Sequence, residues 1–333
     1  MYILGLDTSA YRTSVCLMDQ EGRVVIDERR LLEVKPGGRG LQQSAAVFQH
    51  VKHLPDLLQG KEWPRDQLRA VAVSASPRPV KDSYMPVFHV GLSFARWLAH
   101  TLGVPCYLTT HQEGHVAAGL WALGEVGHRL ERRDAFLAVH VSGGTTELLL
   151  VRPWSGGYQI TSIGGTLDLY AGQLIDRIGV ALGLPFPSGP ALEALAAQAE
   201  EESRLRIPSA VKGTAFSFSG PEAQALRCVA AGEAPPAIAR AVEVCVANTL
   251  EKALRNAFAA GYPRTVLWVG GGMANRFIRR RLQERLEHPA VGAVCHFCPP
   301  AYSGDNACGV AWLGWKQWNS ERVHGKVHGK KGE

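Results

Sequence analysis

The sequence of 333 residues lacks an apolar run long enough to cross a bilayer, and its N-terminus lacks the basic segment followed by an apolar one that marks a secretory leader. Its seven cysteines are an odd number without the spacing of a disulfide framework. These absences exclude the membrane-spanning and the disulfide-rich secreted classes of protein. We therefore expect a cytoplasmic protein with reduced thiols and no membrane partner.

A second Cys-x-x-Cys pair and an interdomain linker are also missing. Cys295-His-Phe-Cys298 has the spacing of half a zinc ribbon or of a redox pair, but alternating small and aromatic residues there favour a strand with structural cysteines. The length allows two domains, and without a linker they should pack closely across a cleft. The formal net charge of +6 is compatible with a nucleic-acid partner but does not by itself indicate one.

One unit of three strands, joined by short turns and therefore antiparallel, occurs twice in the chain. Its two copies comprise residues 2–7, 13–18 and 23–27, and residues 134–141, 147–152 and 158–162. Helical periodicity follows each copy, over residues 42–58 with apolar positions Val47, Val51, Leu54 and Leu58, and over residues 86–102, 274–286 and 307–318. The pattern predicts a duplicated α/β lobe.

The duplication also predicts the domain boundaries. Lobe I comprises residues 1–131 and is completed by a C-terminal helix at 305–320, whereas lobe II comprises residues 132–304. Residues 321–333 form a basic tail whose Gly, His and Lys content predicts disorder.

Two histidines follow a strand predicted at residues 105–108. Thr109 or Thr110 can cap a helix that continues toward Leu123, and His111 and His115 then project from one face of it. Such a pair can bind one transition metal, although two surface histidines near a helix start are the plainer interpretation.

Asp305 precedes the last predicted helix. It can act as the N-terminal cap of that helix. If the helix folds back beside the first lobe, Asp305 is also the natural third metal ligand, and coordination sites remain open for a substrate.

Two glycine turns are candidate phosphate sites. Ser142-Gly143-Gly144-Thr145-Thr146 lies between two strands, where backbone N–H groups can converge on phosphate oxygens. Gly270-Gly271-Gly272, followed by Ala274 and Asn275, lies between a strand predicted from Val266 and a helix, which suits a nucleotide at a helix N-terminus. Each is also readable as an ordinary turn.

Two further residues are candidates for nucleotide or substrate contacts. Asp176 lies two turns into a helix predicted to start near Asp168, placed to reach a ribose or substrate hydroxyl, or else to be an exposed helix acid. Gly189 lies in the tight turn Pro187-Ser-Gly-Pro190, where a ligand can approach the backbone.

In this order the motifs resemble those of the universal tRNA N(6)-adenosine threonylcarbamoyltransferase family, formerly called glycoproteases or O-sialoglycoprotein endopeptidases. The resemblance spans most of the chain. The matching pieces are Asp7-Thr8-Ser9, His111 to His115, Val141 to Gly144, Asp168 to Asp176, Pro187 to Pro190, Phe216 to Gly220, Gly270-Gly271 with Ala274 to Arg276, and Asp305-Asn306.

The resemblance implies a fold, an activity and a set of ligands. The fold is the two-lobed one of actin, sugar kinases and heat-shock ATPases, with an interlobe cleft. The activity is transfer of a threonylcarbamoyl group from threonylcarbamoyl-AMP to the N(6)-amino group of the tRNA adenosine beside the anticodon. The implied ligands of one Fe²⁺ or Zn²⁺ are His111, His115 and Asp305. The implied contacts of the adenine nucleotide (threonylcarbamoyl-AMP, AMP or ATP) are Val141, Ser142, Gly143, Gly144, Thr145, Asp176, Gly189 and Asn275.

The chain departs from the family pattern around the predicted site. The family's opening acids are replaced by Tyr11 and Arg12, and the histidine of its Ser-Gly-Gly-His-Thr turn is Thr145 here. An acid and an arginine are missing around residues 44–50, and the Gly-Pro-Gly-Leu turn reads Ser76-Pro-Arg-Pro-Val-Lys81. These changes suit a divergent paralogue, with Asp7, Ser9, Arg12 and Lys81 at the rim of the site.

Three functions compete. The first is the transferase itself, or a carbamoyl-type transferase with another acceptor. The second is a non-catalytic partner that binds a homologous actin-fold subunit or forms a homodimer. The third is a metalloprotease. Proteolysis is disfavoured because Gln112, not Glu, follows His111. Bound tRNA would be contacted by scattered basic residues, namely Arg78, Lys81, Arg276 and Arg279 to Arg281. The run Arg279 to Arg281 is also explained as the solvent-exposed face of a helix.

Overall fold

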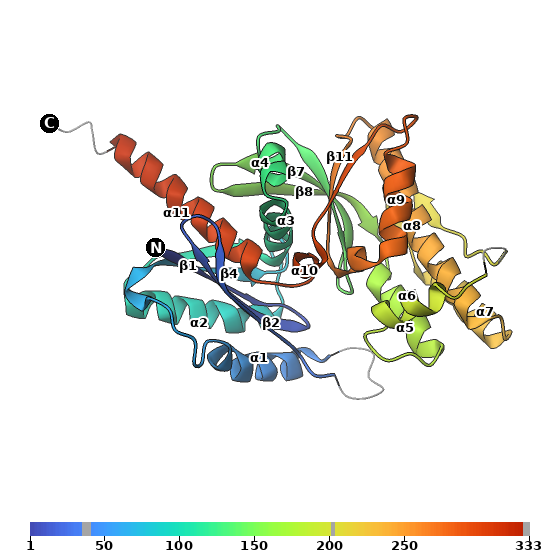
Figure 1. Cartoon of the computed structure of the whole chain (residues 1–333), viewed down its shortest axis with the longest axis horizontal. Coiled ribbons are helices and arrows are strands. Elements are labelled where there is room, and N and C mark those ends of the chain that lie inside the picture. The colour runs from blue at the N-terminus through green and yellow to red at the C-terminus, as the bar shows by residue number, and fades with distance from the viewer. Residues whose placement is uncertain (35–40, 201–203, 329–333) are drawn as a thin grey trace.

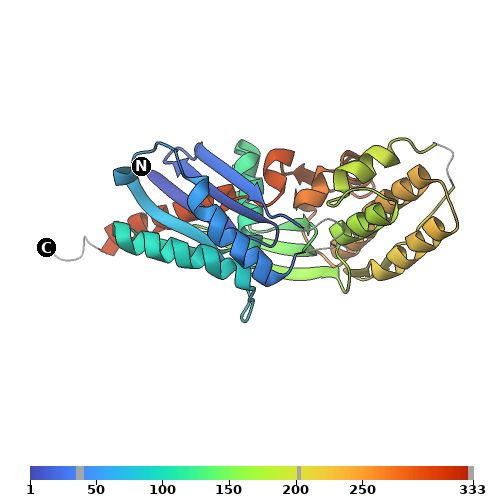
Figure 2. The same ribbon diagram turned by 90° about the horizontal axis from the view of Figure 1, so that it is seen from below.

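The computed structural model describes residues 1–34, 41–200 and 204–328. Figures 1 and 2 show two lobes side by side, one built mainly from the N-terminal elements in blue and one from the green-to-orange elements, with the red C-terminal helix returning to the first lobe. Each lobe is built on its own sheet. In the described part of the chain, no helix is both long and apolar enough to span a membrane.

The first sheet has the strand order β3-β2-β1-β4-β5. Its strands are β1 (Tyr2–Thr8), β2 (Arg12–Asp19), β3 (Val24–Leu31), β4 (Leu68–Ser76) and β5 (Cys106–Thr110), with a short 3-10 turn η1 (Arg65–Gln67) before β4. The pairs β1–β2 and β2–β3 are antiparallel, as predicted, whereas β1–β4 and β4–β5 are parallel.

Helices cover both faces of this sheet. The helices α1 (Gln43–Leu57) and α2 (Pro86–Leu102) bury one face through an aliphatic cluster that includes Leu4, Leu54 and Val90. The C-terminal helix α11 (Cys308–His328) packs on the other face, where Ile3 and Ala72 contact Val310. The last helix thus returns to the first lobe, the condition on which the predicted role of Asp305 depended.

The second sheet has the order β12-β11-β6-β7-β8-β10-β9. Its strands are β6 (Phe136–Val141), β7 (Thr146–Trp154), β8 (Gly157–Thr166), β9 (Ala210–Lys212), β10 (Ala215–Ser217), β11 (Thr265–Val269) and β12 (Val294–Phe297). The order β8-β7-β6-β11-β12 repeats β3-β2-β1-β4-β5, with the first pairs antiparallel again. The predicted duplication is therefore confirmed.

Helices flank the second sheet as well. They are α3 (His111–Ala122), α4 (Glu125–Glu131), α5 (Ala171–Ala181), α6 (Gly189–Ala196), α7 (Ser219–Ala230), α8 (Pro235–Ala259), the 3-10 turn η2 (Gly271–Ala274), α9 (Arg276–Leu286) and α10 (Pro300–Ser303). The helices α5 to α9 join the core on one face, and α3 and α4 join the core on the other.

The helices α3 and α11 pack on each other between the two sheets. On α3, Val116 and Leu120 contact Leu267 of β11 in the second lobe, whereas α11 lies on the first sheet. Gly309 permits the contact, because a Cβ there would collide with the carbonyl oxygen of Gly114. The helix that carries the two histidines therefore meets the segment that carries Asp305.

Two predictions about helices need correction, the buried face of α1 and the start of α9. In α1 the buried face is Ala46, His50, Leu54 and Leu57, and Val51 is 47% exposed, because the helix presents a small residue and a hydrogen-bonded imidazole to the sheet. The helix α9 begins at Arg276 instead of residue 274, because Gly271–Ala274 form a separate 3-10 turn.

The C-terminal region also differs from the prediction. The cap of α11 is the side chain of Asn306, which accepts from the N–H of Cys308 at 3.0 Å, so Asp305 is not the cap. The helix continues to His328, whereas we expected a disordered tail from residue 321. Residues 329–333 of that tail lie outside the described residues. The strand predicted at Cys295–Cys298 is present as β12, with both thiols buried and free.

Candidate metal centre and substrate pocket

The start of α3 orients the two histidines. Thr110 is its cap: its hydroxyl accepts from the N–H of Glu113 at 3.2 Å, and the Glu113 carboxylate accepts from the N–H of Thr110 at 2.9 Å. This reciprocal capping box fixes the first turn. Because the histidines are four residues apart, they share a face, and their Nε2 atoms lie 3.1 Å apart.

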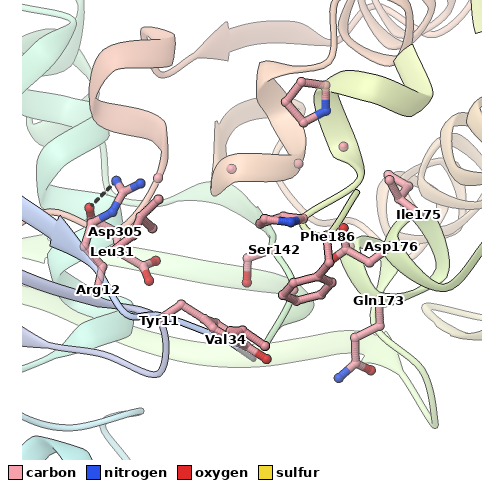
Figure 3. Close-up of a pocket in the computed structure, with 18 of the residues that line it drawn as sticks. Tyr11, Arg12, Leu31, Val34, Ser142, Gln173, Ile175, Asp176, Phe186 and Asp305 are labelled. Atoms are coloured by element: carbon pink, nitrogen blue, oxygen red, sulfur yellow. Dashed lines mark hydrogen bonds between the residues drawn. The ribbon is translucent and has the colours of Figure 1, made fainter. Parts of the chain in front are cut away.

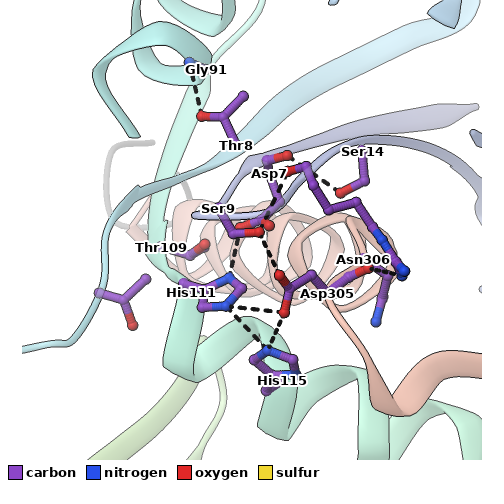
Figure 4. Close-up of polar contacts among 12 residues, drawn as sticks. Asp7, Thr8, Ser9, Ser14, Gly91, Thr109, His111, His115, Asp305 and Asn306 are labelled. Carbon is purple, nitrogen blue, oxygen red and sulfur yellow. Dashed lines mark hydrogen bonds and ion pairs between the residues drawn. The ribbon is translucent and has the colours of Figure 1, made fainter. Parts of the chain in front are cut away.

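Asp305 reaches both histidines from the segment between α10 and α11. Its Oδ1 lies 3.5 Å from Nε2 of His111 and 3.2 Å from Nε2 of His115 (Figure 4). The three ligand atoms lie within 4.8 Å of one another. Only the return of α11 to the first lobe brings this carboxylate to the histidine pair.

The three ligand atoms have the spacing that one metal ion requires. Atoms bound at about 2.1 Å to one ion lie about 3.0 Å apart for octahedral angles and about 3.4 Å apart for tetrahedral ones. The observed separations of 3.1, 3.2 and 3.5 Å fall in or close to that range. Two imidazoles with one carboxylate are also a donor set that Fe²⁺ and Zn²⁺ accept. The residues present therefore fit a transition metal.

A second layer of side chains holds these donors. Oδ1 of Asp7 lies 3.0 Å from Nδ1 of His111, and the hydroxyl of Ser9 donates to Oδ2 of Asp305 at 2.7 Å (Figure 4). Arg12 donates to the backbone oxygen of Asp305 at 3.0 Å. Asp7 is fully buried and lies outside both cavity linings within the described chain, whereas Ser9 lines the second cavity although it is only 2% exposed.

Burial and neighbouring charges set the protonation of the cluster. Burial lowers the pKa of His111, but the carboxylates of Asp7 and Asp305 outweigh burial and raise it to about 10. Burial and the charge of His111 lower the pKa of His115, and the two imidazoles keep the pKa of Asp305 well below its usual range despite burial. Protonated His111 thus carries the positive charge that a metal ion would supply, and a metal ion that binds His111 must displace a proton from it.

A cavity of about 510 Å³ opens beside the cluster, between the lobes. Figure 3 shows Tyr11, Arg12 and Asp305 on one side of it, Asp176 and Phe186 on the other, and Ser142 between them. Five of the predicted nucleotide residues line this cavity: Ser142, Gly143, Asp176, Gly189 and Gly271. Asp176 accepts from the N–H of Ser188 at 2.7 Å, and burial raises the pKa of its carboxyl.

A second cavity, of about 370 Å³, lies over His111. It is lined by the rest of the glycine turn, Gly144 and Thr145, and by Arg78. Both cavities share Tyr11, Ser142, Gly143 and Asp305. Asp305 therefore lies where the two cavities meet, His111 lines the second cavity, and His115 is buried behind them, so one ligand spanning both cavities would pass beside Asp305.

Other predicted nucleotide residues have roles in the fold. Gly270 has φ of 94° and lies so close to the carbonyl oxygen of Val141 that a Cβ would collide with it. Asn275 caps α9 by accepting from the N–H of Ile278 at 2.8 Å, and its amide donates to Glu243 at 2.6 Å. Gly270, Val141 and Asn275 lie outside the linings of both cavities as far as the chain is described.

The predicted basic contacts are dispersed. Lys81 is exposed and lies outside both cavity linings within the described segments. Arg78 lines the second cavity and pairs with Glu147 at 2.5 Å. On α9, Arg279 lies over the ring of Phe297, Arg280 lies 3.8 Å from Glu284, and Arg281 donates to Asn248.

The sequence reasoning missed His140, Glu147 and His50. His140 lines the second cavity, and its ring centroid lies 4.2 Å from that of His115. Glu147 accepts from Gln112 at 2.8 Å in addition to pairing with Arg78. His50 contacts the backbone oxygen of Ser9 at 2.9 Å. These residues could have been found in the sequence as polar residues within an otherwise apolar strand or helix face, as His140 is in Ala138-Val-His140-Val.

Comparisons of the sequence with known proteins point to one family. The sequence model of the tRNA N6-adenosine threonylcarbamoyltransferase family matches residues 46–312. The tRNA N6-adenosine threonylcarbamoyltransferase of a Thermus thermophilus strain is 33% identical over 325 residues, covering 95% of this chain and 93% of its own length. The protein of that name from Methanopyrus kandleri is 31% identical, covering 94% of this chain and 87% of its own.

Solved structures show the fold. The activator of 2-hydroxyisocaproyl-CoA dehydratase from Clostridium difficile superposes with a TM-score of 0.56 at 13% identity, over 97% of this chain and 98% of its own. A glucokinase of the ROK family from Streptomyces griseus gives 0.51 at 12% identity, over 94% and 98%. The fold is therefore the duplicated, two-lobed actin-like ATPase fold expected from the sequence.

Proposed function

Since the chain belongs to the tRNA N6-adenosine threonylcarbamoyltransferase family, we propose that it is an acyltransferase of tRNA modification in the cytoplasm. It transfers a threonylcarbamoyl group from threonylcarbamoyl-AMP to the N(6)-amino group of the tRNA adenosine beside the anticodon. The observation that carries the proposal is the convergence of His111 and His115 on Asp305, which lines both cavities.

We propose that the two histidines and Asp305 hold one Fe²⁺ or Zn²⁺. When bound, such an ion supplies a Lewis acid that stabilises charge on carbamoyl or phosphate oxygens. Asp7 orients the ring of His111, and Ser9 orients the carboxylate of Asp305. This support keeps the three donors in one arrangement before a substrate arrives, which is the preorganisation that catalysis by charge stabilisation requires.

The interlobe cavity is the proposed nucleotide site. Around it, the turn from Ser142 to Thr145 presents backbone N–H groups and hydroxyls suited to phosphate oxygens. Asp176 lies on the wall across from Asp305, and Gly189 also lines the cavity, where a ribose or adenine can be held. Binding there would set the acyl group of threonylcarbamoyl-AMP beside the histidines, so that catalysis rests mainly on positioning.

A reconstituted reaction tests the proposal. Purified protein is supplied with threonine, bicarbonate, ATP, the adenylate-forming enzyme and unmodified tRNA, and the digested tRNA is analysed for threonylcarbamoyladenosine by mass spectrometry. We expect product from the wild type and a loss of at least about 10²-fold in His115→Ala, because a metal ligand is removed. The control is His100→Ala, which changes an exposed histidine on α2. Equal activity of all three proteins would remove the metal site from the mechanism.

A second candidate is transfer to another acceptor, or a partner role without catalysis. It is favoured by Tyr11 and Arg12, which replace the family's acids and line the cavity beside Asp305. Bound metal and nucleotide without modified tRNA would support this candidate. The homologous actin-fold subunit or second copy that it implies would be found as a stable complex by analytical ultracentrifugation, with and without the candidate subunit.

A further inference from the structure

His140 is a buried imidazole in an otherwise apolar strand. On β6, Phe136 and Ala138 belong to the core shared with α3, and His140 follows them in the alternation of the strand. The residue is only 2% exposed. The backbone makes room for its ring at Gly270, where a Cβ would lie 2.7 Å from Cδ2 of His140.

Three nitrogens at this place have no hydrogen-bond partner among the residues that the structure describes. They are both ring nitrogens of His140 and Nδ1 of His115. The two ring centroids lie 4.2 Å apart, with planes inclined by 48°. A buried polar atom without a partner costs about 1–3 kcal/mol, so three of them side by side require an explanation.

The two histidines of α3 differ in their support. A metal-bound histidine ordinarily donates its other ring N–H to a nearby acceptor, which sets its tautomer and orientation. For His111 that acceptor is Asp7. For His115 no acceptor contacts Nδ1 within the described chain, although the ring of His140 packs against the ring of His115.

We propose that His140 is a positioning residue of the metal site. One of its ring nitrogens accepts the Nδ1–H of His115, either after a rotation of the His140 ring or through one bridging water. This contact fixes the tautomer of His115 in which Nε2 is free to bind the ion. The inference rests on the metal site of the proposed function.

Metal affinity provides the test. Zn²⁺ alone is titrated against a competing chelator, and Co²⁺ is used for its visible spectrum, with the full-length chain. We expect His140→Leu to weaken Zn²⁺ binding about 10- to 100-fold, the range found when the outer support of a metal ligand is lost. His140→Asn and His140→Gln keep an acceptor, so at least one of them should retain affinity and spectrum close to the wild type.

A matched variant separates positioning from packing. Val139→Ala removes buried volume from the neighbouring residue of the same strand, on the opposite face, and should lower stability without changing Zn²⁺ affinity or the Co²⁺ spectrum. If all three His140 variants and Val139→Ala lose affinity alike, packing explains the effect and the inference is wrong.

The remaining outcomes distinguish a failure of the role of His140 from a failure of the proposed metal site. If the wild type binds Zn²⁺, His115→Ala abolishes binding and His140→Leu binds as tightly as the wild type, only the role of His140 is wrong. If the wild type binds no Zn²⁺ that depends on His115, the metal site and the role of His140 are both wrong.

Discussion

At the scale of the residue, buried imidazoles connect the core of the first lobe to the site. His50 on α1 is fully buried, contacts Thr13 at 2.8 Å and reaches the backbone oxygen of Ser9, whose hydroxyl holds Asp305. Burial lowers the pKa of His50 to about 4, with Ser9 and Asp7 opposing the shift. The residue is therefore neutral in the folded protein at pH 7: its Nε2–H donates to the backbone oxygen of Ser9, and its Nδ1 accepts from the hydroxyl of Thr13.

This shift predicts a pH dependence of stability. An unfolded histidine binds a proton near pH 6.5, whereas folded His50 binds it only near pH 4, so the folded state is favoured fully above pH 6.5 and loses this contribution as the pH falls toward 4. The loss is on the order of 3 kcal/mol. His50→Gln should show a smaller decrease of the unfolding free energy between pH 6.5 and 4, measured by urea denaturation at a series of pH values. Parallel pH profiles of the two proteins would contradict the assignment.

At the scale of the element, the contact between α3 and α11 decides whether the donors meet. The capping box at Thr110 orients α3, and Asn306 starts α11 directly after Asp305. Gly309 is the point of closest approach, where any side chain would collide with Gly114. The distance between the two helices therefore sets the distance between the Asp305 carboxylate and the histidines.

Gly309→Ala tests this coupling. We expect it to destabilise the protein by about 1–3 kcal/mol, as overpacking does, and to weaken Zn²⁺ binding by displacing Asp305. Gly220→Ala is the control, because Gly220 lies on α7 in open space and a Cβ there meets no atom within 4 Å. Chemical denaturation and metal titration of both variants measure the two effects. Unchanged metal affinity in a destabilised Gly309→Ala would separate the helix contact from the site.

At the scale of the whole molecule, the candidate site joins distant parts of the chain. The histidines follow the first sheet, Asp305 follows the second, and the glycine turn lies between the first two strands of the second sheet. A ligand that binds the histidines together with Asp305 or the glycine turn therefore stabilises the packing of the two lobes and not one lobe alone.

Metal binding should then raise the melting temperature of the entire protein. At a free Zn²⁺ concentration about one hundred times the Kd, the expected stabilisation is about 2.7 kcal/mol. Calorimetry with Zn²⁺ and after removal by chelator measures it, with His115→Ala as the variant that should show no shift. A shift of equal size in His115→Ala would place the bound ion elsewhere.

The sequence by itself determined the local features of this protein. The duplicated strand unit, the helix with two histidines on one face, and the strand at Cys295 follow from periodicity, spacing and capping chemistry, which act between neighbours in the chain. The family could also be inferred, because its motifs occur in order along the chain. The start of α9 and the cap of α11 were misassigned, because Asn275 and Asn306 compete for caps with residues one or two positions away.

Only the tertiary structure decided which polar residues form the site. It brought Asp305 to the histidines through the return of α11, and placed Asp7 against His111 and Ser9 against Asp305 as supports. It assigned Asn275 and Gly270 to the fold, and it revealed His140 beside His115. The physical reason is that these contacts depend on the distance between elements far apart in the sequence, which is set by how the two sheets and α3 and α11 pack, and not by any local pattern.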